Sequence, residues 1–148
     1  MLVPDGFEPP RGLEMYDFRL EPLGPEHNER DYAAWSSSIE HILGSPGYGP
    51  KSSWPRPLSL EDNLGDLERH ARDFAERTGF TYTVLDSDDD VIGCVYVYPA
   101  RDEVHDVHVQ SWVRESRAEL DVPLRVAVTA WLARDWPFER PLYAPLLG

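Results

Sequence analysis

"SWVRESRAELDVPLRVAVTAWLARDWPF", residues 111–138, describes the end of a strand, a short turn and a buried helix. Four apolar residues recur there at the spacing of one helical face: Leu124, Val128, Trp131 and Leu132. In many α/β enzymes the turn between such a strand and helix is rich in glycine and binds phosphate. This chain has no glycine between Gly93 and Gly148, so the turn is either a phosphate-binding loop built without glycine or the remains of one.

The strand that enters this turn is predicted over residues 104–113, because apolar and polar side chains alternate along it. One face holds Val107, Val109, Ser111 and Val113, and the other holds Asp106, His108, Gln110 and Trp112. A hairpin is predicted before it, with strands at 80–84 and 91–98 around the acidic turn Asp86–Asp90. The second strand is almost wholly apolar, so both faces should be covered, and Gly93 within it indicates a bulge or a close backbone approach.

The N-terminal half is predicted to hold two helices. Residues 1–15 form an irregular arm rich in proline and glycine, and a strand follows over 16–23. Apolar stripes predict one helix over 27–44 and another over 59–79. Between the helices, residues 45–57 form a loop that is long enough to act as a lid over a pocket.

Single residues mark the ends of these helices and the role of the loop. Ser59 is a good N-cap, and Gly44 and Gly79 stand where the helices should stop. Tyr48 and Trp54 are large aromatic side chains on the loop. They either belong to a functional lid or pin the loop to the core.

Composition limits the class of protein. A length of 148 residues with 41% hydrophobic residues favours a single globular domain over residues 1–148. The net charge of -13 argues against a nucleic-acid partner, whereas it could attract a cationic amine or simply keep the protein dissolved. The single cysteine, Cys94, excludes an internal disulfide and a cysteine-based zinc site. Without a membrane-spanning run or a secretory signal, a cytoplasmic protein with no membrane partner is expected.

The order of elements predicts the fold class. A strand, two helices with a loop between them, three strands, a helix and a possible final strand at Leu142 and Tyr143 indicate an α/β (α+β) fold. Its mixed, mostly antiparallel central sheet would be flanked by helices. This order resembles the GNAT superfamily of acyl-CoA-dependent N-acetyltransferases over residues 16–136. The likeness rests on "DVIGCVYVYP" (90–99), "VHVQSWV" (107–113) and the helix from Asp121.

The resemblance implies where acetyl-CoA would bind. Its pantetheine arm would pair with the main chain at the end of the strand before the turn. Its pyrophosphate would lie on backbone N–H groups at the start of helix 121–136, where the helix end carries a partial positive charge. The family's turn pattern places Arg114 at its start and puts Ala118 and Leu120 at the two glycine positions. The cofactor-binding residues implied in this way are Trp112, Val113, Arg114, Arg117, Ala118, Leu120 and Asp121.

Several residues depart from the family pattern. Glycine at the position of Leu120 would let the backbone approach phosphate or adopt a positive φ, and a branched side chain obstructs both. Glu119 and Asp121 add negative charge beside the expected phosphates. "RESRAELD" also has good helix propensity, and Arg117 is spaced from Asp121 for an ion pair, so the turn could have become helix. Tyr143 lies in a short tail, without the helix that carries the acid tyrosine of the family.

The resemblance also points to a catalytic base. Acetyl transfer requires a group that removes the proton from the ammonium of the acceptor. The family often places a carboxylate on the strand before the turn, where Asp106 and His108 share a face. One of them is the candidate base, and the alternative is an exposed surface pair. His105 is predicted on the opposite face, so the two histidines do not form a metal-binding pair.

Two functions follow from the sequence. The first is an N-acetyltransferase that moves an acetyl group from acetyl-CoA to a small amine or a peptide amine. The second is a catalytically inactive relative that keeps the fold and serves as a binding or interaction module. The fold does not choose between them. A homodimer is plausible through a sheet edge left free by a missing C-terminal strand.

Overall fold

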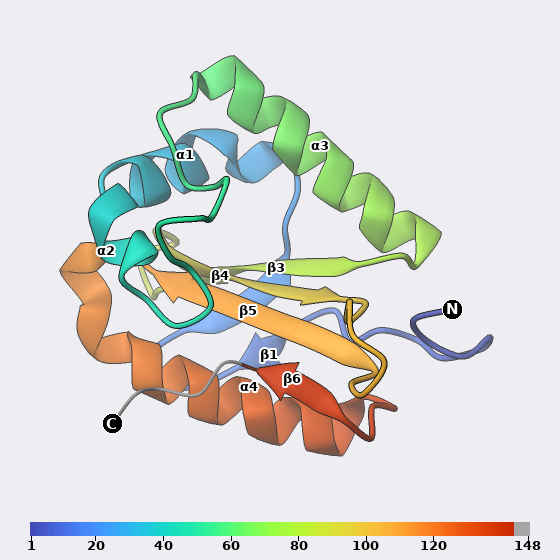
Figure 1. Cartoon of the computed structure of the whole chain (residues 1–148). Helices are drawn as coiled ribbons and strands as arrows, with labels where there is room; N and C mark the ends of the chain where they lie inside the picture. Colours follow the sequence, from blue (N-terminus) through green and yellow to red (C-terminus); the bar gives the residue numbers. More distant parts are fainter. Residues whose placement is uncertain (144–148) are drawn as a thin grey trace.

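A six-stranded sheet separates two layers of helices in the computed structural model, which describes residues 1–143 (Figure 1). The strands are β1 (Leu13–Glu14), β2 (Arg19–Pro22), β3 (Phe80–Leu85), β4 (Val91–Tyr98), β5 (Val107–Val113) and β6 (Pro141–Tyr143). Each strand pairs with the next one in the chain. All pairs are antiparallel except β5 with β6, which are parallel. The predicted mixed, mostly antiparallel sheet with flanking helices is confirmed.

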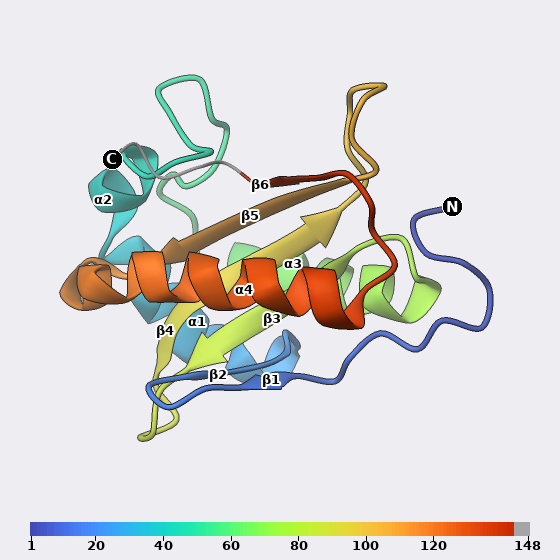
Figure 2. The ribbon, with the colours of Figure 1, turned by 90° about the horizontal axis from the view of Figure 1, so that it is seen from below.

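The helices cover both faces of the sheet. The long helix α4 (Asp121–Asp135) crosses one face, as the view from below shows (Figure 2). The other face is covered by α1 (Asn28–Ser36), α2 (Ile39–Leu43) and α3 (Leu60–Glu76). None of the described helices is long and apolar enough to cross a membrane.

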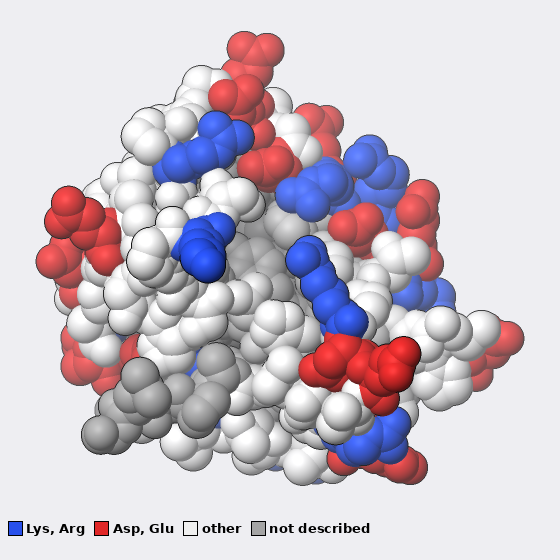
Figure 3. All heavy atoms as spheres, in the orientation of Figure 1, with Lys and Arg blue, Asp and Glu red and all other residues white. Residues whose placement is uncertain are grey.

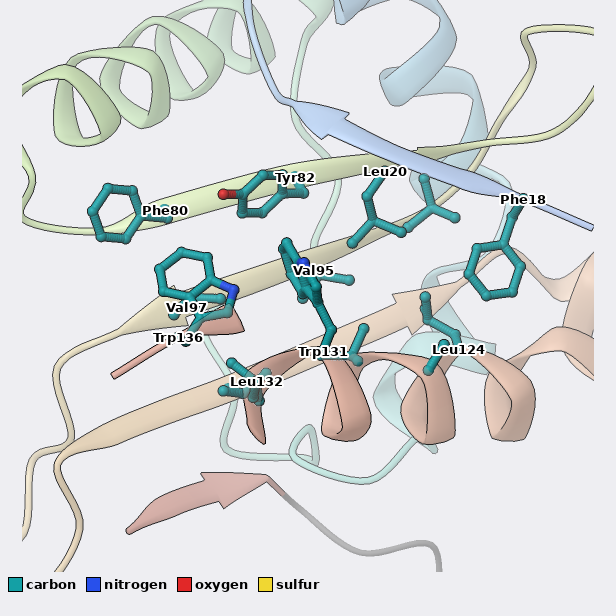
Figure 4. Close-up of a cluster of buried hydrophobic side chains, with 14 of the residues drawn as sticks. Phe18, Leu20, Phe80, Tyr82, Val95, Val97, Leu124, Trp131, Leu132 and Trp136 are labelled. Atoms are coloured by element: carbon teal, nitrogen blue, oxygen red, sulfur yellow. The ribbon is translucent and has the colours of Figure 1, made fainter. Parts of the chain in front are cut away.

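The core lies in two hydrophobic clusters, one on each face of the sheet. The cluster under α4 is rich in aromatic rings (Figure 4). Trp131 meets Tyr82 edge-on at 5.0 Å between ring centroids, and Trp136 lies 5.4 Å from Trp131. The cluster on the other face is built around Trp35 and Trp112, both 1% exposed or less. Large aromatic side chains therefore fix both helical layers onto the sheet.

The centre of the sheet follows the sequence pattern closely. Strand β4 has the predicted bounds and is covered on both faces. The predicted close approach at Gly93 is confirmed, because a Cβ there would lie 2.4 Å from the carbonyl oxygen of Trp112. The strand expected over 104–113 begins later, at Val107. The strand begins later because the carboxylate of Asp102 accepts hydrogen bonds from the N–H groups of Val104 and His105, which holds these residues in a loop.

The helix predicted over 27–44 is two helices. The chain leaves helical geometry at Ser38, whose φ and ψ are -131° and 20°. The preceding Ser37 donates its hydroxyl to the carbonyl oxygen of Ala33 at 2.8 Å, which is the kind of side-chain bond that competes with helix continuation. Gly44 keeps a helical φ of -88°, so the left-handed stop expected there is wrong.

The end of α3 also differs from the prediction. Arg77, not Gly79, takes the left-handed conformation, with a φ of 64°. Its guanidinium donates to the carbonyl oxygens of Phe7 and Pro4 at 2.8 and 2.9 Å and ties down the N-terminal arm. Gly79 serves a different purpose, because a Cβ there would collide with the ring of Tyr98.

Each edge of the sheet is formed by a short strand. The arm expected to be irregular over 1–15 contains β1, a two-residue strand paired with β2. At the other edge, the strand expected at Leu142 and Tyr143 is confirmed as part of β6. This strand covers β5 over Val107–Val109, so that part of the edge proposed for a homodimer is occupied within the chain.

Candidate functional site

The turn after β5 is a 3₁₀ helix, η2 (Glu115–Leu120), and not an open loop. The N–H group of Glu115 donates to the Oγ of Ser38 at 2.9 Å. The N–H groups of Arg117 and Asp121 donate to carbonyl oxygens three residues earlier in the chain. Two residues expected to bind the cofactor, Arg117 and Asp121, therefore have N–H groups that already have partners.

The absence of glycine from this turn has a simple explanation. Ala118 and Leu120 are not among the residues with positive φ, and Leu120 has a φ of -90°. The side chain of Leu120 is 6% exposed and packs in the cluster under α4. The expectation that Leu120 obstructs a phosphate is corrected, because its side chain points into the core.

The charged groups of the turn are paired with one another and with neighbouring elements. Arg117 contacts Asp86 at 3.0 Å and Glu119 at 3.3 Å, not Asp121 as its spacing suggested. Asp121 instead pairs with Arg125 at 3.2 Å. Arg114 donates to the carbonyl oxygen of Val91 at 3.2 Å. Both arginines expected to hold the cofactor are thus engaged within the protein.

The outer edge of β5 would be the partner of the pantetheine arm. The N–H of Arg114 bonds to the carbonyl oxygen of Ile92 in line with β4. Because antiparallel pairs alternate in direction, the main-chain groups of Ser111 and Val113 face away from β4. These groups lie beyond the three residues of β5 that β6 covers.

A segment of the 45–57 loop lies along this outer edge. The carbonyl oxygen of Pro46 accepts a hydrogen bond from Arg125 of α4, at 3.3 Å. The carbonyl oxygen of the next residue, Gly47, accepts from Gln110 on the opposite face of the sheet, at 2.7 Å. On the same edge, the hydroxyl of Tyr143 bonds to that of Ser111. The 45–57 loop therefore crosses the edge that was expected to pair with the pantetheine arm.

A cavity of about 960 Å³ opens on the face of the sheet away from α4. It lies among α1, α3, the 45–57 loop and the strands β4 and β5. Its aromatic lining consists of Tyr48, Trp54, Tyr96 and Tyr98. Trp54 also packs against the buried rings of Trp35 and Trp112 at 5.4 and 6.0 Å between centroids. The loop is thus pinned to the core, as one of the two interpretations of its aromatic residues predicted, and the same rings line the cavity.

Asp31 is a buried carboxylate in the cavity wall that the sequence analysis missed. It lies on α1, is 4% exposed, and accepts a hydrogen bond from Asn63 of α3 at 3.1 Å. Burial raises the pKa of Asp31 from 3.8 to about 6, against the lowering effect of the Asn63 hydrogen bond. One signal was available, because Asp31 precedes the core residue Trp35 by four positions and so shares its helical face.

His70 is a second polar group that the sequence analysis missed. It lines the cavity from α3, with its Nδ1 2.9 Å from the hydroxyl of Tyr98 and 3.0 Å from that of Thr81. Tyr98 in turn donates to Asp73 at 2.9 Å. Burial lowers the pKa of His70 from 6.5 to about 4, so this imidazole is neutral at physiological pH.

The two candidate bases lie in different surroundings. His108 of β5 lines the cavity, and burial lowers its pKa. Asp106 is not among the residues that line it. Both carboxylate oxygens of Asp106 accept backbone N–H groups, from Glu139 at 2.7 Å and Arg140 at 3.0 Å, and so hold the turn before β6. The structure does not bring the two residues together in the cavity. His105 lies in the preceding loop and pairs with Asp102 at 2.8 Å.

Solved structures with the same arrangement are acetyltransferases. The ribosomal-protein-S5-alanine acetyltransferase of Vibrio fischeri matches with a TM-score of 0.61 and 16% identity, over 82% of this chain and 66% of that one. The microcin C7 self-immunity acetyltransferase MccE, solved with acetyl-CoA and AMP, matches with a TM-score of 0.65 and 12% identity, over 86% and 70%. A protein from Bordetella pertussis named for the GNAT family matches with a TM-score of 0.59 and 12% identity, over 82% and 72%. The chain has the GNAT fold.

The GNAT fold is established here by structure alone. No protein-family model matches the sequence. No curated protein matches it either. The chain spans just under two thirds of the S5-alanine acetyltransferase, 66% of its length.

The GNAT resemblance implies acetyl-CoA, and several groups at its expected place already have partners within the chain. Pantetheine would need the β5 edge that Pro46 and Gly47 follow. Pyrophosphate would need free donors in η2 and at the start of α4, where the N–H groups of Glu115, Arg117 and Asp121 already have partners. Glu115 and Glu119 are exposed at this turn and add negative charge, which would repel phosphate.

Proposed function

We propose that this chain is a ligand-binding module with the GNAT fold, which holds a small amine in its cavity and does not use acetyl-CoA. The observation that carries the proposal is a contrast between two places on the sheet. The cavity is open and presents the buried carboxylate of Asp31. The place expected for the cofactor is crossed by Pro46 and Gly47 of the loop, and N–H groups of the turn after β5 have partners within the chain.

The chemistry of the cavity suits an amine. A buried carboxylate is costly unless a positive charge or hydrogen bonds compensate it. Asn63 supplies one hydrogen bond to Asp31, and an ammonium group would supply the missing positive charge. The aromatic faces of Trp54 and Tyr96 add apolar contact area and attract cations. A volume of about 960 Å³ is in the range of ordinary small-molecule sites.

A second candidate function is the N-acetyltransferase predicted from the sequence. The structural neighbours are acetyltransferases, which supports this candidate. His108 and Asp31 both line the cavity, and either could take the proton of an ammonium there. A small amine or a peptide amine would then be the acceptor. The candidate requires that Pro46 and Gly47 leave the edge of β5 and that η2 open to acetyl-CoA.

Calorimetric titration with tyramine, an amine with one aromatic ring, tests the proposed binding site. We expect saturable binding, which Asp31→Asn weakens about tenfold because the ammonium loses its charge partner. p-Ethylphenol, which lacks the amine, should bind no better to the parent protein than to the variant. Equal tyramine affinity in the parent and in Asp31→Asn would contradict the proposed role of Asp31, and no binding of tyramine would contradict the proposed site.

A further inference from the structure

We infer that the amine bound in this cavity also carries a carboxylate or phosphate group, which the basic rim of the cavity recognises. The rim consists of Lys51, Arg56, Arg69 and Arg101. The inference rests on the proposed function, because it specifies the ligand class of the same cavity. It does not depend on whether acetyl-CoA binds.

The charge of the cavity lining is the reverse of the charge of the chain. The sequence has 14 basic and 27 acidic residues, so acidic residues are about twice as frequent. The cavity is lined by the four basic residues of the rim and by two acidic residues, Asp31 and Asp66. Figure 3 shows Lys and Arg side chains around the hollowed centre of this face, with acidic side chains further out. Basic residues therefore outnumber acidic ones in the lining of this cavity, although the chain as a whole is strongly acidic.

Three of the four rim residues lack an acidic partner. Arg69 pairs with Asp66 at 3.5 Å. Within residues 1–143, Lys51, Arg56 and Arg101 take part in no ion pair or side-chain hydrogen bond, although acidic residues are abundant in the chain. All three are exposed. Exposed cations that border one cavity without acidic partners leave their charge available to a bound anion.

The charges are also ordered with depth. Asp31 is buried in the wall of the cavity, whereas the rim residues are exposed at its mouth. Aromatic rings lie among them in the same lining, including Tyr96 and Trp54. A ligand with an ammonium at one end and an anionic group at the other matches this order. A simple cationic amine matches only the part at Asp31, and the rim weakens its binding by repulsion.

The occupant that fits is a small zwitterion or anion, not a nucleic acid. Nucleic-acid affinity comes from many phosphate contacts along an extended basic surface. Here the basic groups border one cavity of about 960 Å³ on a protein with a net charge of -13. Arginine is suited to either a carboxylate or a phosphate through paired N–H donors.

A series of three amines with the same aromatic ring tests the inference. Tyramine carries no anion, L-tyrosine carries a carboxylate next to its ammonium, and O-phospho-L-tyrosine carries in addition a phosphate at the far end of the ring. In calorimetric titrations of the full chain, we expect phosphotyrosine to bind about tenfold more tightly than tyramine or L-tyrosine, because only its phosphate reaches the rim. The gain should shrink in high salt, because the rim is exposed.

A charge reversal at the rim supplies the decisive comparison. In the double variant Arg56→Glu/Arg101→Glu, phosphotyrosine should bind about tenfold more weakly, while tyramine should bind as well as before or better. Arg134→Glu on α4 is the matched control, since it removes a similarly exposed arginine on the other side of the sheet. Thermal denaturation verifies that each variant is folded.

The outcomes separate this inference from the proposed function. If tyramine binds as tightly as phosphotyrosine and the rim variant changes neither, the inference is overturned and the amine site stands. If none of the three amines binds to the parent protein, the proposed function fails and the inference fails with it. If L-tyrosine gains as much as phosphotyrosine, the gain comes from the carboxylate beside the ammonium and not from an anion at the rim, and the inference is overturned.

Discussion

Replacing Leu120 by alanine should lower the free energy of unfolding by about 3 kcal/mol. The side chain is 6% exposed and packs with Leu124 and Val128 in the cluster under α4, so its truncation leaves a cavity. A residue of a phosphate-binding turn would instead face solvent, and its truncation would cost little. The measurement is urea denaturation followed by tryptophan fluorescence, since several tryptophans are buried in the core.

Ala118→Gly is the matched control for this prediction. Ala118 lies two residues earlier in the same 3₁₀ helix and is exposed. Its replacement by glycine should cost about 1 kcal/mol or less, from the greater flexibility of the unfolded chain. A loss below about 1 kcal/mol for Leu120→Ala would show that Leu120 is not a core residue and would reopen the turn as a binding site.

Asp31 and His70 should give opposite dependences of stability on pH. The pKa of Asp31 is raised to about 6 in the folded protein, so the folded state holds a proton that the unfolded state has released. Its contribution therefore makes the protein less stable as pH rises from about 4 to about 6, by about 3 kcal/mol. The pKa of His70 is lowered to about 4, so the unfolded state binds the extra proton. Its contribution makes the protein more stable over nearly the same range, by a similar amount.

Single variants separate the two contributions. Relative to the parent, Asp31→Asn should gain about 3 kcal/mol of stability between pH 4 and pH 7, because the cost of burying a charged carboxylate disappears. His70→Gln should lose a similar amount over the same range. Urea denaturation at several pH values gives both difference curves. A difference curve for Asp31→Asn that is flat with pH would contradict the raised pKa of Asp31.

The sheet and its main helices could be predicted because their signals are local. The apolar run of 91–98 specifies a strand that is covered on both faces, and the apolar stripes of 59–79 and 121–136 each specify a helix and the face that it buries. Besides the local bond of the Ser37 hydroxyl, the helix break at Ser38 involves a tertiary bond, from the N–H group of Glu115 to the Ser38 hydroxyl, and this bond could not be predicted. The sequence contains no local signal for a contact between residues so far apart.

The candidate site was harder to predict than the fold. The turn was aligned with a glycine pattern, which gave Leu120 a place beside phosphate, whereas burial directs its side chain into the core. Asp31 and the basic rim come from α1, α3, the 45–57 loop and the end of β4, which meet only in the folded chain. His108 was found because its strand has a clear alternation, and the structure places it in the cavity wall.

We propose that the GNAT fold of this chain holds an amine in its cavity and has lost the acetyl-CoA site. Calorimetric titration of the full chain with acetyl-CoA, with free CoA as the control, tests it most directly. Pro46 and Gly47 cross the edge of β5, and N–H groups of the turn after β5 have partners within the chain. We therefore expect no saturable heat up to about millimolar cofactor. Saturable binding of acetyl-CoA at micromolar concentration would contradict the account and would establish the acetyltransferase candidate as the one to pursue.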